Sequence, residues 1–503
     1  MDFLTLILVL LIFCGVYYYF KKKLSFFEEL GIPYSPGLPF FGIMLEPLLR
    51  RKHFCEKLLE VYNMHPNAKY IGAFDFNRPV IVLRDLELIK NVTIKNFDNF
   101  PDHVGFFDEN SDPLFGSNLF NMTGDRWKEA RNLLSPAFTS SKMKGMFELM
   151  TVCAKSFIDY ICELPENEKK MLATKDLFTK YTSDVIATCA FGLNVDSLRD
   201  PKNAFYVLGR KATDMEGINS LKIFLARAFP RMMKFLKITF INKQIGDFFK
   251  NIVKTTVTLR DEKGLSRPDM IQLMMDARGK DNKLLKLDIT EMTAQVFIFF
   301  FGGFDTTSTQ MCLIAHELAI NPKIQRKLQE EVDKVMEKSN GEPTYDVINE
   351  MPYSNAVFME SLRLHTQVFT LDRLCRKSFE LPPALPGGKS IVVEPGMAIW
   401  ILPGAMNRDS NYYDNPDVFD PDRFCDKRYS VNDMTNIGFG YGPRSCIGNR
   451  FAILETKILM FFLLSRFTLK PNEKTCSPLR YSKKSFMPVA DGGFWLSIER
   501  RKV

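Results

Sequence analysis

The sequence is poor in the residues that build several common kinds of site. Among its 503 residues there are only 3 Trp and 5 His, and no HExxH motif occurs. The 10 cysteines form no CxxC pair, so neither a disulfide framework nor a cysteine zinc cluster is indicated. Scattered thiols in a chain of this size are typical of a reducing compartment, such as the cytosol or the cytosolic face of a membrane.

The charge pattern also lacks any long basic run, which argues against nucleic-acid binding. Lys and Arg number 67 against 59 Asp and Glu, a formal net charge of +8. This modest excess fits a solvated basic surface; the functional alternative is contact with a membrane or an acidic protein. Because 46% of residues are hydrophobic and neither a low-complexity linker nor an internal repeat occurs, the sequence indicates one large globular domain.

The N-terminus carries an uncharged apolar run. Residues 4–20, LTLILVLLIFCGVYYYF, would form a helix of about 25 Å, near the lower length for a membrane span. Tyr17, Tyr18 and Tyr19 suit the membrane interface, and residues 21–23 are all lysine. Because this basic cluster follows the apolar run, we expect an uncleaved anchor rather than a signal peptide or a buried core helix. Cytosolic lysines would place the rest of the chain in the cytosol.

A proline-rich segment follows the apolar run. IPYSPGLPFFG, residues 32–42, contains three prolines, which fix φ and remove backbone donors. Such a segment is expected to be a stiff, non-helical hinge. We therefore predict an anchor over residues 1–23, a hinge over 24–43 and a single large domain over 44–503.

A long apolar segment predicts a central buried helix. Asp288 and Glu291 resemble a capping box at its start, and Asn321-Pro322 ends it. The segment would span about 32 residues, or roughly 48 Å, through the middle of the domain.

The centre of this predicted helix breaks the local rules. Gly302-Gly303 costs about 1 kcal/mol per residue relative to Ala in a helix interior. Close helix packing at the glycines and self-satisfied threonines would explain the pattern structurally. Asp305 and Thr306 lie within one turn, however, and local conflicts of this kind gather at functional sites. We favour a distorted groove with a proton-handling pair.

Three further motifs pair arginine with an acid or an aromatic ring. Glu360 and Arg363 are spaced to pair on a helix that begins near Tyr353, although an exposed pair contributes only about 0.3–0.5 kcal/mol. If Arg423 also reaches Glu360, the three would form a buried network. Trp127-Lys-Glu-Ala-Arg131 could bind an anion, or could be a surface arginine stacked on tryptophan.

One cysteine stands in a glycine-rich turn, FGYGPRSCIG. A helical pattern begins just after Cys446, and the N–H groups and dipole of a helix N-terminus favour thiolate over thiol. Gly448 would allow a flat group to approach the backbone, and Arg444 offers it a cation. No His follows His365, so a metal-ligating thiolate is favoured over a protease-like dyad. Haem, a flat cofactor with carboxylates, matches this description.

FGYGPRSCIGNRFA resembles the haem-binding loop of the cytochrome P450 superfamily. The matching positions are Phe439, Gly442, Arg444, Cys446 and Gly448. The WxxxR, GGxDTT, ExxR and PxRF motifs stand in that family's order, so the resemblance runs from the anchor to the C-terminus. DPLFGSNLF, GDRWKEARNLLSPAFTSSKMKGMF and FPDHV are similar to the insect microsomal branch that metabolises foreign compounds. One departure is Leu364-His365-Thr366-Gln367, which stands where Pro-Pro is usual and bears on substrate specificity.

The resemblance implies a mainly α fold with small β-sheets, built as one catalytic domain around a long central helix behind a membrane anchor. It implies haem b (iron protoporphyrin IX) as cofactor, with Cys446 as the axial ligand. Asp305 and Thr306 would deliver protons to dioxygen, with room opened by Gly302 and Gly303. The haem propionates would be bound by Trp127, Arg131, Arg373 and Arg444, with His103 joining them at a position where many relatives have arginine. Glu360, Arg363 and Arg423 would be the structural network.

The implied activity is insertion of one atom of O2 into lipophilic substrates, such as plant toxins or insecticides. Electrons would come from NADPH through a membrane-bound reductase, with cytochrome b5 as a second partner, at the cytosolic face of the endoplasmic reticulum membrane (the microsomal fraction). The acidic face of the reductase would meet a basic face, unless these are ordinary solvated residues: Arg126, Lys128, Lys142, Lys144, Arg450 and Lys457.

Aromatic and aliphatic side chains near the predicted groove are candidates for the pocket wall, with core packing as the alternative reading. They are Ile298, Phe301, Phe304 and Phe369, with Phe106 and Phe120 from a loop nearer the N-terminus. Other functions stay open: a hormone or lipid hydroxylase, a haem-thiolate isomerase or dehydratase that needs no reductase, and a non-catalytic haem or lipophile carrier. The Asp305-Thr306 pair argues against the isomerase.

Overall fold

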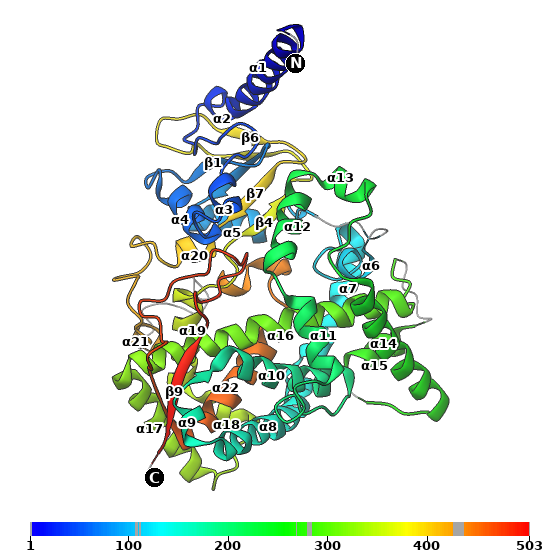
Figure 1. Ribbon diagram of the computed structural model, residues 1–503, viewed down its shortest axis with the longest axis vertical. Helices are drawn as coiled ribbons and strands as arrows, with labels where there is room; N and C mark the ends of the chain where they lie inside the picture. Colours follow the sequence, from blue (N-terminus) through cyan, green and yellow to red (C-terminus); the bar gives the residue numbers. More distant parts are fainter. Residues whose placement is uncertain are drawn as a thin grey trace.

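The computed structural model describes residues 3–105, 109, 112–267, 269–278, 284–425 and 437–501. A helical body surrounds one long central helix, α16, and a smaller strand-rich part lies at the end from which the N-terminal helix projects (Figure 1). The fold is thus mainly α with small sheets, as the sequence predicted.

The central helix α16 (Ile289–Ile320) has 32 residues and is buried along most of its length. Asp288 caps its N-terminus by accepting from the N–H of Glu291 at 2.8 Å. The carboxylate of Glu291 does not close a capping box on Asp288; it accepts from the N–H of Leu287 at 2.7 Å and pairs with Arg126 at 2.8 Å. Pro322 then opens the next helix. Both predicted ends of the helix are confirmed.

Helices pack around α16 on several sides in the helical body, with α10 and α11 in front of it in the view of Figure 1. Short 3-10 or π-helical segments also occur, including η1 (Asn91–Lys95), η4 (Ala187–Phe191), η5 (Ile437–Phe439) and η6 (Gly442–Arg444). The helices other than α1, α2 and α16 are α3 (Leu45–Leu48), α4 (Phe54–Asn63), α5 (Leu86–Lys90), α6 (Pro113–Gly116), α7 (Gly124–Leu134), α8 (Ser140–Glu163), α9 (Glu166–Lys169), α10 (Thr174–Ile186), α11 (Ala204–Thr213), α12 (Gly217–Ala228), α13 (Pro230–Phe235), α14 (Lys243–Lys263), α15 (Met270–Ala277), α17 (Pro322–Lys338), α18 (Tyr345–Glu350), α19 (Pro352–Leu364), α20 (Pro403–Met406), α21 (Asp422–Cys425) and α22 (Asn449–Arg466).

The strands form small sheets at the edges of this body. One sheet has the order β1-β2-β7-β4, in which β2 and β7 are parallel and the other pairs are antiparallel. A second has the order β3-β9-β8, and β5 pairs with β6. The strands are β1 (Tyr70–Asp75), β2 (Arg78–Leu83), β3 (Leu172–Ala173), β4 (Leu371–Leu374), β5 (Phe379–Leu381), β6 (Ile391–Val393), β7 (Ala398–Ile401), β8 (Phe467–Lys470) and β9 (Trp495–Arg500).

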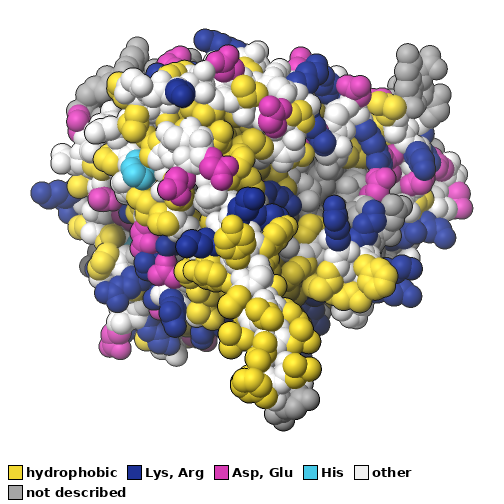
Figure 2. Space-filling view, turned by 90° about the horizontal axis from the view of Figure 1, so that it is seen from above, with side chains coloured by type: hydrophobic (Ala, Val, Ile, Leu, Met, Phe, Trp, Pro, Cys, Tyr) yellow, Lys and Arg dark blue, Asp and Glu magenta, His cyan; other side chains and the backbone are white. Residues whose placement is uncertain are grey.

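The N-terminal helix α1 (Phe3–Leu24) stands clear of the body and is followed by α2 (Phe26–Glu29). Within the stretch Phe3–Glu29, the most apolar 18-residue window has a mean hydropathy of 2.3 and none of it is buried, so the helix is long and apolar enough to cross a membrane. Figure 2 shows hydrophobic side chains covering the projecting helix, with Lys and Arg side chains beside the point where it meets the body.

The proline-rich segment that follows is attached to the sheet. The N–H of Gly72 in β1 donates to the carbonyl of Pro33 at 2.9 Å, and the N–H of Ser35 donates back to Gly72 at 2.8 Å. The N–H of Ile43 donates to Phe74 at 3.0 Å. The segment is non-helical over residues 32–42, as expected, but these bonds make it part of the body rather than a free spacer.

Candidate active site

The turn that carries Cys446 lies between η6 and α22. The N–H of Cys446 donates to the carbonyl of Phe439 at 2.7 Å, which closes the turn. Gly448 is the N-cap of α22, so Cys446 stands just outside the helix N-terminus, as the sequence predicted. The Cys446 side chain retains exposed surface. Burial of its surroundings raises the pKa of the thiol, whereas the N–H of Gly448 and the charge of Arg131 lower it. The thiol is therefore accessible, poorly solvated and close to a cation.

Gly442 and Gly448 have different roles in this turn. Gly442 has a φ of +70°, and a Cβ built on it would stand 2.1 Å from the carbonyl oxygen of Thr93 in η1. Its role in the structure is thus close packing of the turn against a neighbouring backbone. Gly448 has ordinary φ, and the nearest atom to a built Cβ is 3.8 Å away on Phe138, so this position leaves space beside the backbone. Phe439 stacks on Phe358 with ring centroids 6.3 Å apart.

Two nearly buried guanidiniums face the same region with unused donors. Arg373 in β4 donates to the carbonyls of Asp372 at 2.8 Å and Tyr441 at 3.3 Å, while its Nε has no partner among the described residues. Arg444 donates to Pro101 and Met122, each at 2.8 Å, and its Nη1 likewise lacks a partner there.

The charge around these guanidiniums is only partly neutralised. Burial lowers the pKa of Arg444 to about 9; Asp102, 3.2 Å away, opposes that shift, and the nearby charge of Arg373 adds to it. Burial also lowers the pKa of Arg373. Unpaired buried cations are costly, so an anion with two acceptor groups would stabilise this arrangement. The donor set therefore fits the two carboxylates of a haem.

Helix α7 adds the predicted tryptophan and arginine to this region. The guanidinium carbon of Arg444 lies 3.9 Å from the centroid of the Trp127 ring, a stacked cation–π contact. Arg131 is half-buried, and burial lowers its pKa while Cys446 acts in the opposite direction. The structure thus brings both motifs, WxxxR and FGYGPRSCIG, to one place.

His103 stands at a position where many relatives have arginine, and a carboxylate holds its ring. Its Nδ1 lies 2.9 Å from Oδ1 of Asp372, and its ring stacks on Phe120 with centroids 4.8 Å apart. Burial lowers the pKa of His103. Nδ1 is therefore engaged within the protein, and only Nε2 is left to reach another group.

The middle of α16 turns two of its motif residues toward open space. A Cβ built on Gly302 meets nothing within 4 Å. Thr306 is half-buried, and its hydroxyl donates one turn back to the carbonyl of Gly302. Such back-bonding competes with the helix ladder and favours a bend. Gly303 faces the opposite way: a Cβ there would stand 3.0 Å from Ile186 in α10. Close helix packing, the structural alternative, thus accounts for Gly303 and not for Gly302.

Asp305 points toward α10, where its partner was not foreseen from the sequence. Lys175 lies 2.8 Å from Oδ1 of Asp305 and also donates to the Asp305 carbonyl at 3.0 Å. Its ammonium further contacts Ser308 and Thr309, at 2.9 and 2.6 Å. The acid of the expected proton-handling pair is therefore held by a salt bridge on the side of α16 that faces α10.

The ExxR helix carries a buried network. Arg363 pairs with Glu360 through two hydrogen bonds of 2.7 and 2.8 Å, and both side chains are completely buried. Arg423 reaches the same carboxylate at 3.2 Å. The structure brings these three residues together, although Glu360 and Arg423 are 63 positions apart in the chain.

The predicted pocket walls divide into three groups. Ile298 and Phe301 on α16, and Phe369, are half-buried, whereas Phe120 is 50% exposed beside His103. Phe304 is completely buried against Phe300, with ring centroids 4.8 Å apart, so it has no surface to offer a ligand. Phe304 therefore belongs to the core packing, whereas Gly303 keeps some exposed surface although it packs against Ile186. Phe106 lies outside the described residues.

The prediction that Lys457 belongs to a basic docking face is wrong. Lys457 is 2% exposed, and its ammonium donates to Asn349 at 3.0 Å and Asn355 at 2.8 Å. Burial lowers its pKa to about 7. Other members bind acids on the surface: Lys144 pairs with Asp346, and Lys128 with Asp98.

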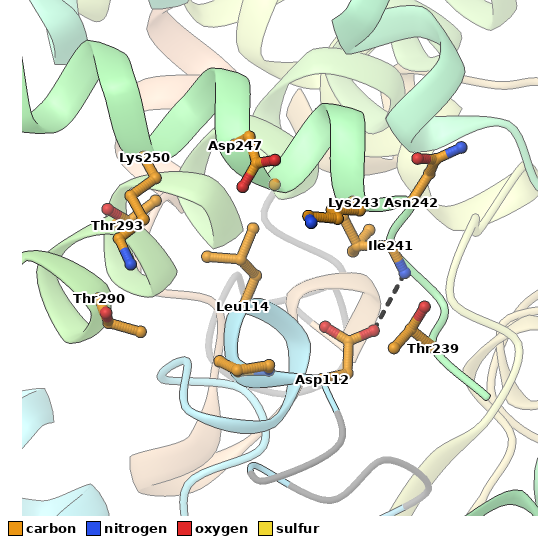
Figure 3. Close-up of a pocket in the computed structure, with 12 residues that line it drawn as sticks. Asp112, Leu114, Thr239, Ile241, Asn242, Lys243, Asp247, Lys250, Thr290 and Thr293 are labelled. Atoms are coloured by element: carbon orange, nitrogen blue, oxygen red, sulfur yellow. Dashed lines mark hydrogen bonds between the residues drawn. The ribbon is translucent and has the colours of Figure 1, made fainter. Parts of the chain in front are cut away.

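A cavity of about 260 Å³ opens between α6, the start of α14 and the start of α16 (Figure 3). Asp112 at its edge accepts from the N–H groups of Ile241 and Phe240, at 3.0 and 2.8 Å. Thr290 and Thr293 contribute from α16, roughly 20 Å along the helix from Thr306. None of the predicted site residues lines this cavity, so it is separate from the Cys446 region.

Comparison with known proteins identifies relatives over nearly the whole chain. The family model described as Cytochrome P450 matches residues 32–495. Cytochrome P450 9e2 of Blattella germanica is 43% identical, covering 95% of this chain and 94% of that protein. Probable cytochrome P450 9f2 of Drosophila melanogaster is 37% identical, covering 95% of each. Cytochrome P450 6B2 of Helicoverpa armigera is 33% identical, covering 97% of this chain and 96% of that protein.

Proposed function

The chain belongs to the cytochrome P450 family, and on that basis we propose that Cys446 is the residue that holds its haem, in a site completed by Arg373 and Arg444. Membership makes the protein a monooxygenase that binds haem b through a cysteine thiolate. The expected insect branch is confirmed, since insect P450 proteins match over nearly the full length. One observation carries the assignment of Cys446: an accessible thiol stands close to the charge of Arg131, beside two buried guanidiniums with unused donors.

When bound, the haem supplies the activation of dioxygen, and the protein supplies the binding, orientation and electrostatics around it. Nε of Arg373 and Nη1 of Arg444 would donate to the two propionates. Trp127 holds Arg444 by stacking, and Arg131 adds a further cation. The N–H of Gly448 supports a negative charge on the sulfur of Cys446. Paired charges of this kind would make haem binding specific in orientation.

Thr306 is the residue we propose to hand a proton to the reacting dioxygen. Its hydroxyl lies on the open side of α16 beside Gly302, where no side chain competes for the space. Asp305, in its salt bridge with Lys175, is the neighbouring acid that would pass protons from the α10 side. A positioned proton donor of this type contributes about 10²–10⁴-fold to a rate.

The substrates we propose are lipophilic foreign compounds. Ile298 and Phe301 on α16, and Phe369, keep partial exposure, and such apolar side chains suit flat, uncharged molecules. The same parts would serve a hydroxylase of an endogenous hormone or lipid, so product identification decides between them.

A P450 of this kind works with a redox partner, generally a reductase, and the N-terminal helix fits membrane association. We propose the NADPH-dependent flavoprotein reductase, with cytochrome b5 as a second donor. We further propose the endoplasmic reticulum membrane as the site, with the catalytic domain on the cytosolic face. The lysines that end α1 support this orientation, because basic residues flanking a span are retained in the cytosol.

Carbon monoxide difference spectroscopy of the purified, reduced protein tests the assignment of Cys446. The wild type should give the spectrum of a thiolate-ligated haem, and Cys446→Ser should abolish it. An imidazole-type spectrum in the wild type, or an unchanged spectrum in the variant, would overturn the assignment. Turnover of 7-ethoxycoumarin should require NADPH and reductase. Turnover of hydroperoxides with no need for a reductase would instead support an isomerase or dehydratase.

A further inference from the structure

The segment after α19 departs from the family's usual Pro-Pro and gives the chain a side-chain amide at residue 367. Gln367 is 8% exposed and lies beside the middle of α16. A proline at such a position offers neither an N–H nor a side-chain donor. The departure was expected to affect substrate specificity, but the contacts of Gln367 lead to another part of the site.

Gln367 bonds the main chain of Thr306. Its Nε2 donates to the carbonyl oxygen of Thr306 at 2.9 Å and to Oε1 of Gln310 at 3.1 Å, so both amide hydrogens are used. The Thr306 carbonyl can only accept, which fixes the orientation of the Gln367 amide with nitrogen toward α16. Nε2 of Gln310 then donates to Oγ of Ser361 at 2.8 Å. A buried chain of hydrogen bonds thus joins α19 to the centre of α16.

The segment that carries the Gln367 side chain is held in place by further hydrogen bonds. Thr366 donates to the carbonyl of Leu362 at 2.9 Å and accepts from Asn407 at 2.8 Å. His365 lies 2.7 Å from Glu317 near the end of α16. The two residues before Gln367 are therefore fixed, and the amide has little freedom to follow a shift of α16.

We propose that Gln367 is a positioning residue for Thr306, an inference that rests on the proposed function. The hydroxyl of Thr306 donates to the carbonyl of Gly302. The hydrogen bond from Gln367 to the Thr306 carbonyl therefore connects this turn of α16 to the segment after α19. Held in this way, the hydroxyl keeps one orientation toward the open face of α16. Without the Gln367 amide, the turn would sample other orientations, and proton delivery would lose its timing relative to electron transfer.

The test compares Gln367→Met, which keeps the length but removes the donors, with the matched control Gln329→Met in α17, where an equally buried glutamine amide donates to Phe467 and Thr468 and not to the turn of Thr306. Gln367→Met should speed hydrogen–deuterium exchange of the α16 amides around residue 306. With 7-ethoxycoumarin, reductase and NADPH, product formed per NADPH should fall several-fold, while the carbon monoxide spectrum and the substrate's Kd stay unchanged. Gln329→Met should lower Tm without altering exchange around residue 306 or product per NADPH. Gln367→Asn, one methylene shorter, should act in the same direction as Gln367→Met and serves if that variant folds poorly.

A double-mutant cycle separates positioning from general stability. In a Thr306→Ala background, Gln367→Met should cause no further loss of product per NADPH, because it acts through the missing hydroxyl. A further several-fold loss there, or unchanged exchange and coupling in the single variant, would overturn the inference. A wild type without the thiolate-type spectrum would overturn the proposed function itself. An unaffected Gln367→Met variant in a normal wild-type background would overturn only the role of Gln367.

Discussion

Glu360 and Arg363 form a two-pronged ion pair in which neither side chain has exposed surface. Nε of Arg363 donates to Oε2 and Nη2 to Oε1 of Glu360, at 2.7 and 2.8 Å. The same carboxylate accepts from Nε of Arg423 at 3.2 Å and from the N–H of Asp420 at 2.8 Å. One negative charge therefore joins α19 to the segment that precedes the Cys446 turn.

Removing that charge should destabilise the protein strongly. In Glu360→Gln two guanidiniums remain buried without their counterion, so we expect the free energy of unfolding to fall by about 3–5 kcal/mol. Urea unfolding of the haem-loaded protein measures the loss. Lys144→Met is the matched control, because its partner Asp346 lies on the surface and no measurable change is expected there. A loss in Glu360→Gln as small as in the control would contradict the network's structural role.

Thr306 and Thr307 are adjacent hydroxyls in different surroundings. Thr306 faces the open side of α16, whereas Thr307 is 2% exposed and its hydroxyl has no partner among the described residues. Thr306→Ala should keep substrate binding and NADPH consumption but lower product per NADPH roughly tenfold or more. Thr307→Val should keep that ratio and leave stability equal or up to about 1–3 kcal/mol higher, since an unpartnered buried hydroxyl is removed. Unaltered coupling in Thr306→Ala would argue against a proton-donor role.

Glu455 in α22 gives the stability of the protein a pH dependence. Its side chain is completely buried, and neither carboxyl oxygen has a partner among the described residues. Burial raises the pKa of this carboxyl well above its ordinary value of 4.5. The folded protein therefore holds this proton to higher pH than the unfolded chain does. The contribution of the site to stability is complete below the ordinary pKa and is lost as pH rises above it.

Glu455→Gln, which cannot ionise, should thus be more stable than the wild type at neutral pH. The difference in Tm should shrink as the pH is lowered toward 4.5. Glu342→Gln, which changes an exposed carboxylate paired with Lys155, is the control and should show no such convergence. A Tm difference for Glu455→Gln that stays constant across this pH range would show that the carboxyl is solvated in the folded protein.

Features of the structure that depend on local chemistry could be predicted from the sequence. Features that depend on packing between helices could not. The ends of α16 follow from Asp288 and Pro322, and the network of Glu360 with Arg423 follows from the need to neutralise buried charge. The partner of Asp305 depends on how α10 lies against α16, which no periodicity within either helix specifies. The same packing of α10 against α16 decides that Gly303 contacts Ile186 while Gly302 lies on the open face.

The contacts of two buried polar side chains could not be predicted from the sequence for a related reason. Lysine is rarely buried, so the sequence favours a surface position for Lys457, yet two acceptors, Asn349 and Asn355, bind its ammonium inside the fold. The acceptors come from residues more than a hundred positions earlier in the chain. The contact of Gln367 with Thr306 could not be predicted either, because Thr306 lies 61 positions earlier, in a helix whose packing the segment of Gln367 does not specify.

The two left-handed glycines before Cys446 should respond differently to alanine. Both have positive φ, +80° at Gly440 and +70° at Gly442, so each substitution strains the backbone by about 1–2 kcal/mol. At Gly440 the nearest atom to the new Cβ is 3.6 Å away, so no further movement is needed. At Gly442 the Cβ would stand 2.1 Å from the Thr93 carbonyl, a backbone atom that cannot turn aside.

Gly442→Ala should therefore push the turn away from η1 and displace Arg444 and Cys446, which follow directly. We expect Gly440→Ala to lower Tm slightly while retaining haem and the thiolate-type carbon monoxide spectrum. Gly442→Ala should lower Tm further and reduce both haem content per protein and the amplitude of that spectrum. Haem absorbance, the carbon monoxide spectrum and Tm, measured on both variants, check this. Equal losses in the two would mean that contact with Thr93 does not position the cysteine turn, and that strain at φ alone controls its stability.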